Sequence, residues 1–181
     1  SENKPIGYLY AFLAYFSWGF VPIYWKLIGH IGYSEILGHR IIWAALILGL
    51  YLLFTSGFAE FISIFREKKK ILALTFSTIL IFFNWNLFIW GVTHNFIVEC
   101  SLGYFINPMI NVVLGLFVLK EKMKWTQWPA VILAVIGIIF LFEQNVGHPW
   151  ISILLALSFA LYGLIRKQAS VTPATGLFFE T

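Results

Sequence analysis

The sequence predicts an all-α fold, a polytopic transmembrane helix bundle, from its composition and from the length of its apolar segments. Hydrophobic residues make up 60% of the chain and charged residues 11%, and the mean hydropathy is +0.86. Soluble domains carry about 25% charged residues, so a soluble globular protein is excluded. The loops between the apolar segments are too short to hold a soluble domain.

Six apolar segments approach the length of about 20 residues that a helix needs to cross roughly 30 Å of hydrocarbon. They are 6–28, 35–55, 71–93, 98–119, 125–142 and 150–165. The first segment is expected to stay as a span, because it is too long for the hydrophobic region of a signal peptide and lacks a cleavage pattern. The last two segments are short, which packed helices tolerate.

Basic residues indicate the orientation of the bundle. Ten of the 12 lysines and arginines fall at the N-terminus, in the loops after the second and fourth segments, or after the sixth. They are Lys4, Arg66, Lys68, Lys69, Lys70, Lys120, Lys122, Lys124, Arg166 and Lys167. Alternating spans place all ten on one side, and the opposite loops (29–34, 94–97 and 143–149) carry none. Positive loops stay in the cytoplasm, so a cytoplasmic N-terminus is predicted.

The remaining composition excludes several classes of function. The net charge of +4 belongs to these loops, so we expect a lipid bilayer and not a nucleic acid as partner. Cys100 is the only cysteine, and no metal-ligand spacing is present. The sequence shows no phosphate-binding loop and no nucleophile elbow. We therefore expect no enzyme, no cofactor and no metal, and transport driven by a gradient and not by ATP.

A weak internal similarity predicts a repeat. The paired segments are 155–165 with 11–21, and 176–181 with 35–40. The offset spans five helices, an odd number, so the second copy must enter the membrane with opposite topology, as in many transporters. We expect a first five-helix repeat at 1–145 and the truncated start of a second at 146–181. Because the chain begins with Ser1 and stops inside an apolar stretch, we expect a fragment of a longer protein.

The segment 99–115 carries a polar stripe inside an apolar span. Every fourth residue gives Glu99, Gly103, Asn107, Asn111 and Gly115. Pro108 removes a backbone donor and frees the carbonyl of Tyr104. Two interpretations stay open. The stripe can line a cavity, where Asn107, Asn111 and Tyr104 offer polar groups to a solute, or it can pack against another helix through its glycines and amides. We favour the cavity for the two amides and packing for the glycines.

Aromatic and amide residues of the third segment are further candidates. Asn84 and Asn86 flank Trp85, and successive helical residues point about 100° apart. One amide is therefore expected to line the cavity and the other to bond a neighbouring helix. Trp85 and Trp18 lie deep within their spans, where a cavity wall and plain packing are equal alternatives.

Titratable residues gather near the outer ends of the helices. Glu99 begins the fourth segment, where the helix dipole explains its position; the alternative is proton coupling. Glu35 and His39 lie one turn apart on one helix face, beside Arg40. A local ion pair with snorkelling is the default interpretation, and the alternative is an extracellular gate or an anion-attracting vestibule to which His39 and Arg40 belong.

Five long motifs are collinear over nearly the whole chain. They are AYFSWGFVPIYWKL (14–27), EILGHRIIW (35–43), NWNLFIWGV (84–92), ECSLGYFINPMINVVLG (99–115) and SFALYGLIRK (158–167). In this order they resemble RarD-type proteins of the EamA, or drug/metabolite transporter, superfamily. The resemblance implies ten helices in two inverted five-helix repeats, a central cavity and the bacterial inner membrane as location. The chain lacks most of the last four helices of that pattern.

The expected function is secondary transport, as a permease or efflux protein, of a small organic metabolite or drug. Alternating access would move one repeat against the other around a midplane cavity. One alternative is a non-transporting membrane scaffold or assembly partner, in which the polar stripe is a helix–helix interface whose Asn residues tolerate Ser or Gln. Another is a channel-like facilitator, whose flux would not saturate.

Overall fold

The structure is a computed structural model that describes residues 4–143 and 147–181. Six helices in these residues are long and apolar enough to span a membrane, as the sequence predicts. They are α1 (Lys4–Leu27), α2 (Tyr33–Leu53), α4 (Lys68–Thr93), α5 (Ile97–Phe117), α6 (Trp128–Glu143, after a 3₁₀ turn at Trp125–Gln127) and α7 (Pro149–Ala169). The largest difference from the prediction is the end of α7, expected at 165. The helix continues past its apolar part through Arg166 and Lys167.

Two short helices add to the six spans. The helix α3 (Gly57–Ile64) lies between α2 and α4, and α8 (Pro173–Phe179) follows α7. The sequence did not predict α3 as an element, and it predicted the residues of α8 only as the start of another apolar stretch. In the fold, α8 contacts α2, α3 and α4.

Glu60 of α3 holds the beginning of α8. Its carboxylate accepts hydrogen bonds from the backbone N–H of Thr172 at 2.9 Å, from the Thr172 hydroxyl, and from the Thr175 hydroxyl at 2.7 Å. Thr172 is the N-cap of α8, so the carboxylate meets the positive end of that helix. Partial burial raises the pKa of Glu60, but these hydrogen bonds outweigh it, and the pKa lies below its usual range.

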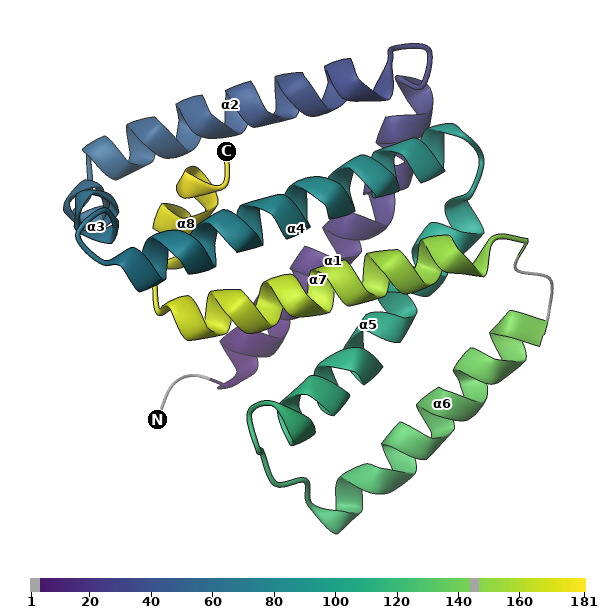
Figure 1. Cartoon of the computed structure of the whole chain (residues 1–181). Helices are drawn as coiled ribbons and strands as arrows, with labels where there is room; N and C mark the ends of the chain where they lie inside the picture. The colour runs from purple at the N-terminus through teal and green to yellow at the C-terminus, as the bar shows by residue number, and fades with distance from the viewer. Residues whose placement is uncertain (1–3, 144–146) are drawn as a thin grey trace.

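The helix α7 lies at the centre of the bundle. Figure 1 shows it between α4 and α5, with α2 on the far side of α4 and α6 on the far side of α5. The contact of α7 with α5 is close. A Cβ added at Gly103 would lie only 3.0 Å from Leu155 Cβ and from the carbonyl oxygen of Ser152. Glycine at this position therefore permits the close approach, in agreement with the packing role that the sequence suggests.

A tight turn joins α4 to α5. Asn95 has φ 69°, the N–H of Phe96 donates to the carbonyl of Gly91 at 2.7 Å, and the N–H of Asn95 donates to that of Val92 at 3.3 Å. These two bonds satisfy carbonyls at the end of α4 in a Schellman motif, for which asparagine tolerates the left-handed conformation. The turn sets α5 directly beside α4, where the Cys100 side chain packs on Gly91.

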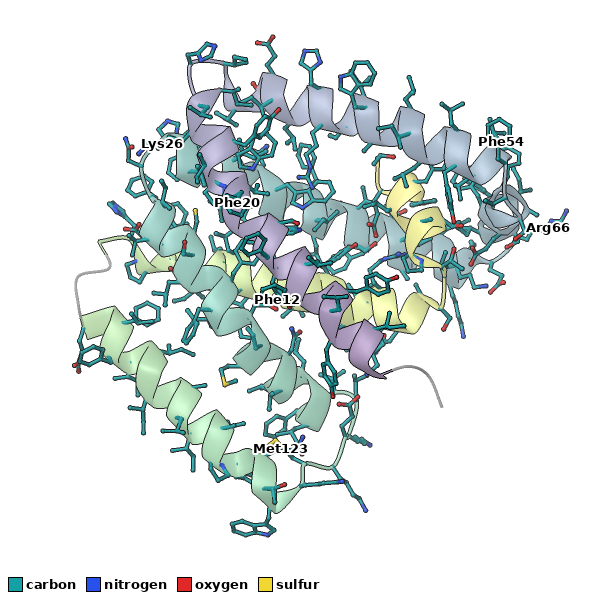
Figure 2. All side chains as sticks on the ribbon, turned by 180° about the vertical axis from the view of Figure 1, so that it is seen from behind. Phe12, Phe20, Lys26, Phe54, Arg66 and Met123 are labelled. Atoms are coloured by element: carbon teal, nitrogen blue, oxygen red, sulfur yellow. The ribbon has the colours of Figure 1, made fainter. Side chains whose placement is uncertain are left out.

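The outer helices α1 and α6 expose apolar side chains. None of their described side chains is fully buried, and Figure 2 shows Phe12 and Phe20 along the outward side of α1. Such surfaces suit contact with lipid, because lipid tails do not penalise exposed apolar groups. Figure 2 also places Lys26 and Arg66 near opposite ends of α2.

Candidate substrate cavity

An aromatic cavity lies between α1, α2, α4 and α5, with a volume of about 200 Å³. It is lined by Trp18, Val21 and Trp25 of α1, Arg40 of α2, Trp85, Phe88 and Ile89 of α4, and Tyr104 of α5. The residues from α1 are spaced three, four and seven apart, and Phe88 and Ile89 of α4 follow Trp85 by three and four, so each helix contributes one face. Arg40 is the charged member of this wall.

Three larger hollows lie elsewhere on the described residues. One of about 370 Å³ lies between α5 and α6 with an almost wholly apolar wall, and one of about 560 Å³ lies beside α3 and α8. The third, about 410 Å³, lies on the surface of α4 and includes Asn86. The aromatic cavity differs because residues from four separate helices line it and because a cation and four polar-tipped aromatic rings meet there.

Arg40 packs its guanidinium over the ring of Trp85. The Cζ atom lies 3.3 Å from the ring centroid, a cation–π contact that reaches about 2 kcal/mol when it is desolvated. The ion pairs among the described residues are Lys70–Glu67, Arg166–Glu180 and Lys167–Glu121. The default interpretation of a local ion pair with Glu35 is therefore wrong for Arg40. Its side chain turns inward to Trp85, whereas Glu35 and His39 are exposed.

Tyr104 connects the cavity to α7. Its ring meets Trp18, Phe88 and Phe159 edge-on, with centroids 5.7, 5.4 and 5.8 Å away. Its hydroxyl donates to Asn84 Oδ1 at 3.3 Å. The sequence points to the backbone carbonyl of Tyr104, whereas the structure places its side chain in the cavity wall. The helix α5 continues through Pro108 without interruption.

The two amides of α4 have different surroundings. Asn84 is fully buried and donates from Nδ2 to the carbonyl of Leu155 and to the hydroxyl of Ser158, both at 2.9 Å. It therefore bonds the neighbouring α7. Asn86 is half-buried and lies in the surface hollow of α4. The structure places neither amide on the wall of the aromatic cavity, so their direct contact with a substrate stays a prediction.

The amides of the polar stripe lie at the contact of α5 with α7. Asn107 is buried and donates from Nδ2 to the carbonyl of Ala156 at 3.2 Å. Asn111 donates to Asn107 Oδ1 at 2.8 Å. This is the geometry of the helix–helix interpretation, in which polar side chains bond across membrane helices. Neither residue lines the aromatic cavity, and a substrate-binding role for them stays a prediction.

Glu99 and His39 also lie outside the cavity wall. Glu99 is buried in the first turn of α5, and its backbone carbonyl accepts a hydrogen bond from Ser152 at 2.7 Å. His39 is exposed on α2, one residue before Arg40. Their roles in coupling or gating stay predictions.

The sequence did not predict four of the wall residues, Val21, Trp25, Phe88 and Ile89. A signal was present, because Trp25 lies two helical turns after Trp18 and therefore on the same face of α1. Phe88 and Ile89 follow Trp85 by three and four residues, which places them on the same face of α4 as Trp85. The sequence does not show that these faces of α1 and α4 meet.

A buried polar cluster at α8 was also missed. Glu180 accepts hydrogen bonds from Ser77 of α4 at 2.7 Å and from Tyr162 of α7 at 3.0 Å, and Arg166 Nε lies 3.4 Å from Glu180 Oε1. This cluster fixes the end of α8 between α4 and α7. The repeat similarity pairs Glu180 with His39 but gives no sign of these partners.

Comparisons with known proteins agree with the resemblance of the motifs. The model of the EamA-like transporter family matches residues 5–143. Protein RarD of Escherichia coli is 42% identical over 175 residues, which cover 97% of this chain and 59% of that protein. The uncharacterized transporter YojE of Bacillus subtilis is 41% identical over 185 residues, which cover 100% of this chain and 61% of that protein.

A more distant relative is the chloramphenicol-sensitive protein RarD of Pseudomonas aeruginosa, 25% identical over 164 residues, which cover 88% of this chain and 55% of that protein. No solved structure matches the chain. The chain spans about three fifths of the length of the curated relatives that it matches most strongly. With its six membrane-spanning helices, it belongs to the EamA-like transporter family.

Proposed function

We propose that this chain forms part of a secondary transporter that moves a small organic metabolite or drug across the bacterial inner membrane by alternating access. The observation that carries the proposal is the aromatic cavity between α1, α2, α4 and α5, with Arg40 in its wall. Small-molecule sites in helix bundles are concave, mainly apolar, and carry a few placed polar groups. The transporter names of relatives such as YojE support the same class of function.

Trp18, Trp85, Tyr104 and Arg40 are the proposed substrate contacts. Asn84 and Asn107 act behind them, because they hold α7 against α4 and α5 through hydrogen bonds to its backbone. Packing of this kind supports the cavity wall from behind.

The proposed transporter consists of two repeats. Residues 1–145 form the first and 146–181 the start of the second, with the N-terminus in the cytoplasm. The curated relatives are longer than this chain, and we propose that the remainder of the full-length protein supplies the opposite wall of the cavity. Inverted repeats place the substrate site at their interface.

A gradient supplies the energy in this proposal. Glu99, buried in the first turn of α5, is the candidate for proton coupling, although its place at a helix start is also favourable for a carboxylate that plays no part in transport. Glu99→Gln tests the coupling role. It should remove the dependence of uptake on an imposed pH gradient while leaving exchange at equal pH intact.

The test of transport is counterflow into proteoliposomes made with the protein at its full natural length. The labelled solutes are benzoate, benzamide, benzylamine and chloramphenicol, the last because a relative carries that drug in its name. A transporter gives saturable accumulation of at least one solute above empty liposomes. Flux that rises linearly with concentration favours a channel-like facilitator. Insertion without flux of any solute contradicts the proposal and favours a scaffold, for which the Asn107 contact with α7 would be sufficient.

A further inference from the structure

The charge of the aromatic cavity narrows the class of solute. We propose that the cavity binds a small organic anion, an aromatic monocarboxylate of about one ring, whose carboxylate pairs with Arg40 and whose ring lies among Trp18, Trp25 and Trp85. This inference rests on the proposed function and specifies its substrate class.

The positive charge of Arg40 is not balanced by an acidic residue in the cavity wall. No described residue forms an ion pair or a hydrogen bond with the Arg40 guanidinium. A half-buried cation without an anion has lost part of its hydration, and an anionic or hydrogen-bonding partner would offset this loss. Guanidinium presents planar pairs of N–H donors that match a carboxylate in a bidentate manner.

The cavity does not suit a cationic solute. Aromatic cages bind cations over the faces of their rings, so the tryptophans alone would suit an ammonium solute. Arg40 already lies on the face of Trp85, 3.3 Å from its centroid. A second positive charge in the same cavity would meet repulsion that a low-dielectric surrounding strengthens.

The polar groups and the volume of the cavity suit a single aromatic ring that carries one charged group. Tyr104 directs its hydroxyl to Asn84, so Arg40 is the main group of the wall that is ready for a charged solute. The rest of the wall is aromatic or aliphatic and suits a planar apolar ring. An apolar cavity of about 150 Å³ accepts benzene, and the 200 Å³ built by this chain therefore accommodates one ring with its carboxylate.

The test measures binding, so it does not depend on transport. Full-length protein in nanodiscs is titrated with labelled benzoate, benzamide and benzylamine, which share one ring and differ in charge. The wild-type protein should bind benzoate at least about tenfold more tightly than benzamide, because a hydrogen bond to a charged group is stronger than one between neutral groups. Benzylamine should bind most weakly.

The variant Arg40→Gln should weaken benzoate binding by about tenfold or more and leave benzamide binding within about twofold. Arg66→Gln is the matched control, since it removes the same charge from an exposed position just after α3, a helix that contributes no residue to the cavity wall. Equal loss of benzoate and benzamide affinity in Arg40→Gln would mean a purely structural role for Arg40 and would overturn the inference.

The order in which the wild-type protein binds the three solutes tests the anion inference even if Arg40→Gln does not fold. Benzamide or benzylamine binding as tightly as benzoate, or no binding of benzoate, overturns the anion inference. Saturable counterflow of a neutral or cationic solute in the same protein would leave the proposed transport function standing. Binding of benzoate without counterflow of any of the four solutes would contradict transport and leave the anion site in place.

Discussion

Asn84 should be a main polar anchor between α4 and α7. It is fully buried, donates two hydrogen bonds of 2.9 Å to Leu155 and Ser158, and accepts a longer one of 3.3 Å from Tyr104. A hydrogen bond between membrane helices contributes about 0.6 kcal/mol on average. Three such bonds give about 2 kcal/mol, and this is the expected loss in the free energy of unfolding for Asn84→Leu, which keeps most of the side-chain volume.

Asn84→Ala should destabilise further, because truncation also leaves a cavity in a packed contact. The matched control is Asn86→Ala on the same helix, where the half-buried amide lies in a surface hollow and the expected change is within about 0.5 kcal/mol. The assay is reversible unfolding in mixed micelles with increasing sodium dodecyl sulfate. An unchanged unfolding midpoint for Asn84→Leu, or an equal loss for Asn86→Ala, would refute the assignment.

Three other predictions follow from the fold. Gly103→Leu should destabilise by about 1–3 kcal/mol in the same assay, because a Cβ there meets α7 at 3.0 Å, whereas Gly19→Leu, with no atom within 4 Å, should be neutral. Because folding lowers the pKa of Glu60, its carboxylate stabilises the docking of α8 at pH values above the ordinary pKa of 4.5. This stabilisation is lost as the pH falls through the lower pKa of the folded protein. Hydrogen exchange of α8, corrected for intrinsic rates, should therefore rise below pH 4.5 in the wild type and be elevated already at pH 6 in Glu60→Gln; a pH-independent protection of α8 would contradict this. In protein freed of other reactive cysteines, Ser34→Cys should react with an impermeant maleimide from outside intact cells and Ser56→Cys only after permeabilisation, and the reverse pattern would overturn the predicted orientation.

The spans could be predicted because crossing a membrane imposes a length and a composition that local sequence must satisfy. The six helices therefore appear where hydropathy predicts them. Hydropathy did not predict where α7 ends, because it marks only the apolar part of a helix. Arg166 and Lys167 continue the same helical backbone hydrogen bonding. The short helices α3 and α8 depend on contacts such as Glu60 with Thr172, which are distant in sequence.

The candidate site could be predicted only in part. Helical periodicity shows that Asn107 shares a face with Gly103, and burial in a membrane requires a polar partner for its amide. Periodicity does not say whether that partner is a solute or a backbone carbonyl, and the structure supplies the carbonyl of Ala156. Trp85 and Arg40 were both candidates, but their contact depends on how α2 packs against α4. No local pattern carries that information.

The central claim is that the aromatic cavity is the substrate site of a transporter, and filling the cavity tests it most directly. The measurement is counterflow of labelled benzoate in proteoliposomes containing wild-type protein, Val21→Trp or Ile23→Trp. Val21 lines the cavity, whereas Ile23 is 58% exposed on another face of the same helix, so both variants add one indole to α1. The account predicts that Val21→Trp abolishes saturable counterflow and that Ile23→Trp retains it. Equal counterflow in both variants would contradict the account.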